Sequence, residues 1–475
     1  MSPFQFRRLH RGTRLVPCSL ATVFTIAVAS VSLAGAQGGS VTAGPRDARS
    51  APSHEPPPLT LDAVFVRLAA HNPRLTGARA EADAATARVA PARTLPDPRV
   101  QLGLMNRDLP SLRPMETLGM DQLQVMQMIP IGGKRGSAGR AAEARAASAR
   151  ARASARWWDL RRDAAVIFYE LWATDRRLAV ARETQALLAR AADAAASIYG
   201  VGQGRLSDVL RAQMEITRMS DDLIRMQAMR ATLAARLGGL LLVDVDPDTV
   251  TLRILRLGAL LAGSVTDSTG RLDRLAQAHR PMLSAGRHEV SAAAESEQLA
   301  RQDLWPDIEL GVQLARRPPS AAPPGMPATT DWMTSLMVGA SVPLFARSRQ
   351  LQMRTEAAAM RTMAEADVTA MEAETRAMVH EGLAMLRQSR ALQALYAGTL
   401  WPQAVAARDA AFAAYRAGHV DFITLLEAHM TANRVRQEQY VVRAAEGKAI
   451  AELEMLTGRS LTDGLALLPL EDEIR

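Results

Sequence analysis

The chain has 475 residues, only 4% of them aromatic, and carries a formal net charge of +8 at pH 7. This low content of large side chains is compatible with helices that pack through alanine-lined seams. It argues against the thick core of an ordinary two-domain enzyme. Arginines alternating with aspartate and glutamate supply the charge without a compact basic block, which indicates solvated helix faces and argues against nucleic-acid binding.

Residues 1–36 have the pattern of a cleavable signal peptide. An apolar stretch, Leu15 to Leu33, follows a positive leading region and ends at the small-x-small site Ala34-Gly35-Ala36. We expect cleavage there and a flexible N-terminal segment over residues 37–58. The single cysteine, Cys18, lies inside the leader, so we expect a mature chain without disulfides, a thiolate metal site or a cysteine nucleophile. The leading region contains four arginines: Arg7, Arg8, Arg11 and Arg14.

A segment near the start of the expected mature chain is repeated later in the sequence. His71-Asn72-Pro73 through Pro98 matches His279-Arg280-Pro281 through Pro306, with no gap between the paired prolines. Each copy reads as a polar, alanine-rich helix that ends at the second proline and leads into an alternating stretch. The repeat predicts a chain built as two copies of one unit.

Each copy then predicts two strands with one apolar and one polar face. Val100–Leu104 and Ile308–Leu314 alternate apolar residues with polar or very small ones, which is the period of a strand. After proline-rich loops, Asp121–Ile129 and Trp332–Val342 predict the second strand of each pair. Pro130 and Pro343 follow these strands, where a missing N–H costs least.

A long helix follows each pair of strands. Residues 137–198 lack proline and glycine beyond the first turn, which predicts a helix of roughly 90 Å at 1.5 Å per residue. We expect it to end at Tyr199–Gly204 and to be followed by a return helix over Arg205–Leu237. Tyr415–Val420 and a return helix from near Asp421 repeat this pattern. The first long helix has a coiled-coil seam at Leu160, Ala164, Ile167, Leu171, Thr174, Leu178, Ala181, Gln185 and Leu188.

These elements predict the domain organisation. We assign the first repeat to residues 59–240, a linker to 241–270, the second repeat to 271–457 and a C-terminal tail to 458–475. No stretch of eighteen apolar residues follows the leader, so an exported chain of this kind is either periplasmic or enters the outer membrane as strands. Four strands cannot close a barrel, so membrane strands would require several copies of the chain.

With its two halves, its Asp97-Pro98 and Trp305-Pro306 junctions, the run from Gln127 to Lys134 and its Tyr-x-x-Gly turns, the chain resembles the TolC-type outer-membrane efflux proteins. The resemblance covers about residues 59 to 460, and it looks nearest to the heavy-metal efflux channels. It implies a mainly α fold with transmembrane β-strands, in which a homotrimer forms a twelve-stranded barrel continuing into an α-helical tunnel. It also implies a periplasmic adaptor, an inner-membrane pump of the RND type and contact with outer-membrane lipid.

The resemblance assigns roles to residues near the two helical turns. Tyr415 and Asp208 match two positions that hold the periplasmic entrance shut, whereas Val420 occupies the position where relatives have a basic residue. Glu427 matches one acidic position at the aperture, and Thr424 occupies the other. Three Glu427 carboxylates in a trimer would favour cations, although an ordinary exposed helix charge fits this position equally well. The turns that would dock the adaptor contain Gly200, Val201, Gly202, Ala417, Gly418 and His419.

Methionines surround the first predicted strand pair, and thioethers suit soft ions such as Cu(I). We therefore expect cargo contacts at Met120, Met126 and Met128, although methionines that fill lipid-facing positions would give the same pattern. Metal cargo is modestly favoured over drugs or secreted proteins. A soluble periplasmic coiled-coil scaffold is the main rival in another class, and the four strands argue against it. No catalytic motif, cofactor signature or resident metal site occurs, so we expect no enzyme.

Overall fold

The computed structural model describes residues 59–108, 110–111, 119–202, 204–246, 252–253, 268–316 and 332–461. The predicted signal peptide and the segment 37–58 lie outside these residues, as do most of the linker and most of the tail. Residues 59–461 contribute to one compact unit, in which the two repeats pack on each other.

The first repeat contains short helices, a strand pair and a long helical hairpin. Its long helix α4 begins three residues before the predicted start and ends two residues after the predicted end. The return helix α5 continues to Leu241, four residues beyond the prediction. In chain order the elements are α1 (Leu61–His71), α2 (Pro73–Ala87), α3 (Val89–Arg93), β2 (Arg99–Met105), β3 (Met120–Ile129), α4 (Lys134–Gly200) and α5 (Leu206–Leu241). The flanking strand β1 (Leu59–Thr60) pairs in parallel with β4 (Leu252–Arg253).

The second repeat has the same order with one interruption. Its long helix is divided by a π-turn, η3, where Trp401 N–H bonds to the Tyr396 carbonyl five residues earlier. Pro402, which follows, has no N–H to continue the α-helical ladder. The elements are α6 (Ser268–His279), α7 (Pro281–Gln302), β5 (Asp307–Arg316), β6 (Trp332–Ser341), α8 (Gln350–Leu395), η3 (Tyr396–Leu400), α9 (Trp401–Arg416) and α10 (Phe422–Thr457).

The helices before the strands end earlier than predicted. α3 ends at Arg93 and α7 at Gln302, four or five residues before Pro98 and Pro306. Proline disfavours the α conformation only at the residue before it, here Asp97 or Trp305, so it limits how far each helix can extend but does not set the residue at which the helix ends. In the first repeat the helix also divides at Arg88, between α2 and α3, whereas α7 runs without a break.

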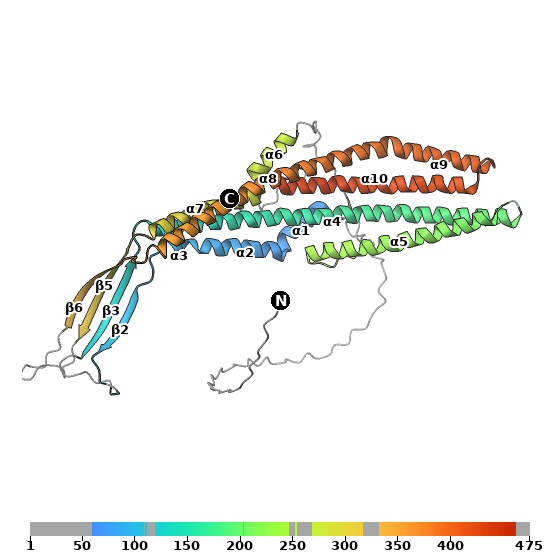
Figure 1. The fold of residues 1–475 in the computed structure, drawn as a ribbon. Coiled ribbons are helices and arrows are strands. Elements are labelled where there is room, and N and C mark those ends of the chain that lie inside the picture. Colours follow the sequence, from blue (N-terminus) through green and yellow to red (C-terminus); the bar gives the residue numbers. More distant parts are fainter. Residues whose placement is uncertain are drawn as a thin grey trace, which may run out of the picture. The chain divides into compact units, whose positions relative to one another are not determined.

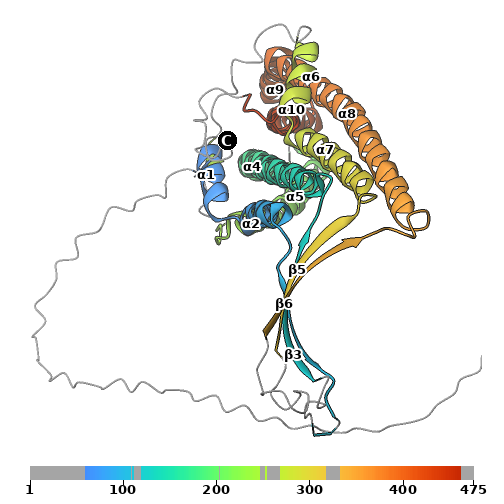
Figure 2. The same cartoon turned by 90° about the vertical axis from the view of Figure 1, so that its left-hand side faces the viewer.

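The four longer strands form one antiparallel sheet in the order β2-β3-β5-β6, which joins the two repeats side by side. β3 pairs with β5 over nine residue pairs, from Asp121 with Arg316 to Ile129 with Ile308. All four predicted strands are confirmed. The sheet extends from one end of the long helices (Figures 1 and 2), and the helical turns lie at the other end, as Figure 1 shows.

Helix α4 forms the centre of the helical part, where it packs against α5, α7 and α10. Its predicted seam is confirmed: seven of its nine positions are buried, and Ile167 and Gln185 are partly buried. Beside this seam, the buried Arg161 guanidinium bonds to Glu454 of α10 at 3.2 Å and stacks over Phe65. This ion pair ties the first repeat to the second within the core.

Candidate functional site

The two helical hairpins end in turns with the same geometry. Gly202 and Gly418 both have positive φ, of 77° and 73°, which glycine adopts without strain. Their N–H groups donate to the carbonyls of Tyr199 and Tyr415 at 2.9 and 3.0 Å. The repeated Tyr-x-x-Gly pattern therefore encodes the same turn in both hairpins. Val201, in the first turn, is 71% exposed.

The two turns lie close together in space. Arg205 after the first turn and Asp421 after the second approach to 4.0 Å, although both side chains are largely exposed. A stronger link comes from Phe422, which begins α10 and is buried in a cluster with residues of the first hairpin, including Ala212. Its ring meets Tyr415 edge-on, with 5.8 Å between the centroids. The entry of α10 is thus packed against the first hairpin.

Tyr415 and Asp208, the two predicted latch residues, lie near each other in the single chain. Partial burial raises the pKa of the Tyr415 phenol, and the Asp208 carboxylate raises it further. Within the described residues, no hydrogen bond joins this phenol to that carboxylate; Ser207 Oγ donates to Asp208 at 3.5 Å. Val420, at the position where a basic residue was expected, is partly buried. The two side chains of the proposed latch therefore interact electrostatically without forming a hydrogen bond.

Glu427 and Thr424 lie on the exposed side of α10, beyond the buried Leu425 and Leu426. Together with Asp421 they follow a three-residue spacing, which places them on one helix face. His429 lies nearby, and its pKa is lowered by burial and by Arg408, against the opposing effect of Asp409. Glu427 is thus available to a neighbouring chain or to solvent.

The sheet has one apolar and one polar face. Cross-strand partners share a face, so the register places Leu102, Leu123, Leu314 and Thr334 together. The apolar side chains of that face are among the most exposed in the molecule; Leu102 is 83% exposed and Leu336 is 77% exposed. The opposite face contains Gln101, Gln124, Gln313 and Ser335 in one row.

The three methionines predicted to contact cargo all lie on the polar face. Met120, Met126 and Met128 alternate along β3 with the residues of the apolar face, and they share their face with Gln122 and Gln124. Sequence reasoning missed Met333 and Met337 of β6, which the register brings to the same face. The alternation within Trp332–Val342 already placed Met333 and Met337 on the face opposite the apolar residues, so the sequence could have indicated them. Met115, another methionine between the first two predicted strands, lies outside the described residues.

Lys134 links the two repeats where strands meet helices. It follows Gly132 and Gly133, both with positive φ, and begins α4. Its ammonium donates to the Trp305 carbonyl at 2.9 Å and to Asp307 at 2.8 Å. Although the sequence singled out the run that contains Lys134, it did not indicate this partner, which lies in the other half of the chain.

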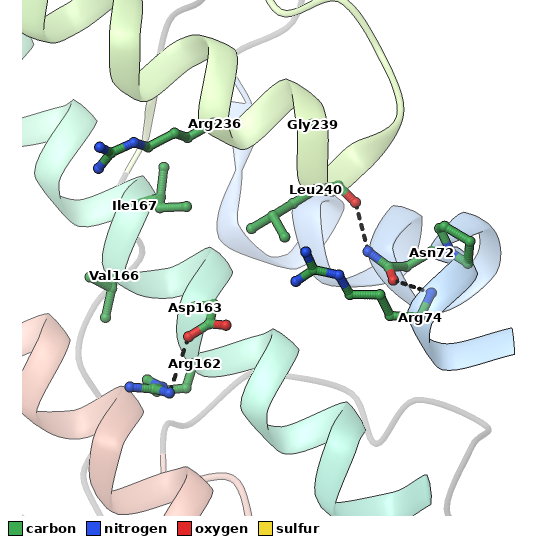
Figure 3. Close-up of a pocket in the computed structure, with 10 residues that line it drawn as sticks. Asn72, Arg74, Arg162, Asp163, Val166, Ile167, Arg236, Gly239 and Leu240 are labelled. Carbon is green, nitrogen blue, oxygen red and sulfur yellow. Dashed lines mark hydrogen bonds and ion pairs between the residues drawn. The ribbon is translucent and has the colours of Figure 1, made fainter. Parts of the chain in front are cut away.

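A hollow of about 520 Å³ lies where α1 and α2 meet α4 and α5 (Figure 3). Asn72 donates to the Leu240 carbonyl at 2.9 Å and accepts from Arg74 N–H, so it fixes the end of α5 against the start of α2. Arg162 and Asp163 form an ion pair at 3.2 Å on its wall. The two Asn72 hydrogen bonds give this residue a structural role in the first repeat, whereas the equivalent Arg280 of the second repeat makes no such cap.

Within the described residues, histidine, cysteine, aspartate and glutamate side chains form no group of three that could hold a metal ion. None of the helices described here has the length and hydropathy needed to cross a membrane.

Comparisons with known proteins give the same architecture. The sequence matches the family described as outer membrane efflux protein over residues 64–241 and 272–459. Among curated proteins, none matches the sequence. The fold is similar to that of the outer membrane protein VceC from Vibrio cholerae, with a TM-score of 0.69 and 17% identity over 84% of this chain and 96% of that one.

Two further solved structures share the fold. CusC, described in terms of folding and transmembrane channel formation, has a TM-score of 0.70 and 15% identity over 84% of this chain and 92% of its own. The open state of the MtrE outer membrane channel of Neisseria gonorrhoeae has a TM-score of 0.66 and 15% identity over 86% and 90%.

Proposed function

The chain belongs to the outer membrane efflux protein family, and we propose that it is the channel subunit of a tripartite efflux system. In this role it is a passive duct from the periplasm to the exterior, with neither ATP hydrolysis nor covalent chemistry. Residues 1–36 serve as its export signal, and residues 59–240 and 271–457 are its two working repeats, joined by the linker 241–270.

The two-faced sheet is the observation that carries this proposal. An exposed apolar face opposite a polar one fits strands with lipid on one side and water on the other. In lipid, each unpaired backbone group at the outer strands β2 and β6 would cost several kcal/mol. Three copies that pair these edges would form a closed twelve-stranded barrel, with the long helices continuing as a tunnel. We therefore propose a homotrimer in the outer membrane with a periplasmic helical extension.

The helical turns are the proposed docking surface for a periplasmic adaptor. Gly200–Gly202 and Ala417–His419 lie at the end of the helices away from the sheet (Figure 1). The nearby Asp208 and Tyr415 form the proposed latch, and Glu427 the proposed aperture charge. The proximity of Tyr415 to Asp208 and the exposure of Glu427 support these roles. The adaptor would link the duct to an inner-membrane pump of the RND type.

Heavy-metal cations are the proposed cargo. The methionines on the polar face support this choice because thioethers bind soft cations and would line the lumen rather than face lipid. Multidrug efflux and type I secretion are the alternatives within the family. A soluble periplasmic scaffold is disfavoured, since it would leave the apolar sheet face in water.

Membrane fractionation tests the duct itself. We expect the full-length protein in the outer-membrane fraction, as a trimer that dissociates on heating and conducts ions in a planar bilayer. Recovery as a soluble periplasmic monomer without conductance would overturn the proposal.

A deletion strain tests the cargo. Greater sensitivity to copper, silver, zinc or cobalt, with unchanged sensitivity to dyes and antibiotics, is the expected result. The reverse pattern would leave the duct standing and replace metal cations by organic compounds as the cargo.

A further inference from the structure

We propose that Met126 and Met337 form a paired thioether site for soft monovalent cations on the polar face of the sheet. The proposal rests on the channel function above, and it assigns a binding position and a substrate class to the lumen. It concerns side chains of β3 and β6, which come from different repeats.

The two methionines converge over a glycine. Met126 pairs with Gly311 of β5, and Gly311 pairs with Met337, so the three residues form one row across three strands. A Cβ atom placed on Gly311 would lie 3.3 Å from Met126 Cγ and 3.4 Å from Met337 Cε. Both side chains therefore lean toward the space that the missing side chain leaves open.

Burial confirms that this convergence is local. Gly311 is buried although it lies in a single-layered sheet. Met337 is partly buried, whereas every other residue of β6 is exposed. The neighbouring Ser335 and Gly339 on the same strand are exposed. The two methionine side chains therefore cover the glycine while remaining partly exposed themselves.

Polar groups around the pair suit a transient cation. Gln124 Nε2 donates to Met337 Sδ at 3.9 Å, so a cation would bind this sulfur by displacing the amide donor, whose carbonyl oxygen could then turn toward the ion. Glu309 lies two residues before Gly311 on the same face, whereas Arg99 lies beyond Met126 at the β2 side. The Glu309 carboxylate attracts a cation to the side of Met337, whereas the Arg99 guanidinium repels a cation from the side of β2.

The chemistry selects soft ions of low charge. Two neutral thioethers bind Cu(I) or Ag(I) without losing a proton and without any redox step, and they bind Mg²⁺ or Ca²⁺ poorly. Two sulfur ligands per chain give weak binding, which suits conduction because an ion must also leave. In a trimer the site would occur three times around the lumen.

Silver titration of the purified full-length protein tests the site. Ag(I) in chloride-free nitrate buffer is the probe, because it stays monovalent in air. Wild-type protein is compared with Met126→Leu, Met337→Leu and the double variant, since leucine keeps the volume but removes the sulfur. Met229→Leu, at an exposed position of α5, is the matched control.

We expect each of the two sheet variants to lose one bound Ag(I) per chain, or to bind it at least tenfold more weakly, while Met229→Leu keeps this sheet-site ion. Gly311→Ala should weaken binding with both sulfurs present, because its methyl group would press on Met126 Cγ and Met337 Cε and force the two side chains apart. Equal Ag(I) binding by wild-type protein, both single variants and Gly311→Ala would overturn the site.

Potassium conductance in a planar bilayer separates this inference from the proposed function. Conducting variants with unchanged Ag(I) binding would remove the site and leave the channel. Wild-type protein that never conducts would remove the channel and, with it, the lumenal role of the site. Ag(I) block of wild-type conductance that disappears in Met126→Leu would support both.

Discussion

The two helical hairpins share one sequence pattern but differ in how they pack. In the first, α4 runs for 67 residues without a break, and buried residues occur along most of its length. In the second, the π-turn η3 separates α8 from α9, and Ala404 is the only buried residue of α9, which is described throughout. The two hairpins therefore differ most toward their turns, where α4 continues to bury residues and α9 buries almost none.

The interruption is held by side chains of the neighbouring helix. Gln439 of α10 donates to the Tyr396 carbonyl at 3.1 Å, and the Arg436 guanidinium stacks on Trp401 at 4.9 Å. Within one chain, the far end of the second hairpin therefore has fewer buried contacts than the first. Local opening is expected to start where such contacts are fewest, so we place movement of the entrance in the second hairpin.

Breaking the anchor shared by both hairpins should have the largest effect. Glu454→Ala leaves the buried Arg161 guanidinium without its carboxylate and removes an acceptor for the Leu461 N–H. We expect a loss of about 3–5 kcal/mol in the free energy of unfolding, measured by urea titration at fixed protein concentration.

Glu452→Ala is the control for this variant. Its partner is Arg162 at 3.5 Å, and both side chains are about one-third exposed. We expect a change below about 1 kcal/mol. Equal effects of the two variants would contradict a shared buried anchor.

Exchanging the residues that distinguish the two long helices tests the comparison directly. Pro402→Ala lets α9 regain a backbone N–H, so amide hydrogen exchange near residues 396–406 should slow, by up to about 3 kcal/mol in opening free energy. Ala186 is the matching exposed position in α4, and Ala186→Pro should accelerate exchange there by a similar amount. Unchanged exchange in both would show that the interruption does not set local stability.

Loosening the contact between the hairpins should have a smaller effect. In the closed state of the proposed trimer the latch would gain a hydrogen bond worth about 1 kcal/mol, so Tyr415→Phe and Asp208→Ala should each raise closed-state conductance in a planar bilayer by about fivefold. Asp193→Ala, at an exposed position of α4, should change nothing. The latch assignment would fail if both variants kept the wild-type conductance.

The same contact predicts a response to alkaline pH. The folded state raises the Tyr415 pKa above its usual value near 10, so it holds the phenolic proton more tightly than the unfolded chain does. The resulting stabilisation is complete below pH 10 and is lost as the pH rises through the folded pKa. Conductance should therefore increase in this alkaline range, and the increase should be absent from Tyr415→Phe.

The smallest expected effect lies beside the anchor on α4. Burial raises the pKa of Asp159 despite the opposing charges of Arg162 and Arg156. Asp159→Asn should therefore increase stability at pH 7 by less than about 1 kcal/mol. The gain should disappear as the pH falls and the wild-type carboxyl is protonated, which urea titrations at several pH values would measure. A decrease in stability at pH 7 would mean that the charge is held favourably.

Local patterns were sufficient to predict the elements. Alternation located all four long strands, and the stretch 137–198 without proline or further glycine placed α4 within three residues of its observed ends. The Tyr-x-x-Gly turns and the duplication were also readable, because strand period, helix period and glycine turns depend on residues near one another in the sequence. The same signals did not predict the break at Arg88 or the π-turn before Pro402.

Only the tertiary structure decided which side chains meet. The sequence proposed Met120, Met126 and Met128 as one group, whereas the register pairs Met126 across Gly311 with Met337, more than 200 residues later. The tertiary structure likewise pairs Lys134 with the carbonyl of Trp305 and Arg161 with the carboxylate of Glu454. Such partners depend on how strands align and helices dock, and a repeating local pattern is compatible with several alignments until packing selects one.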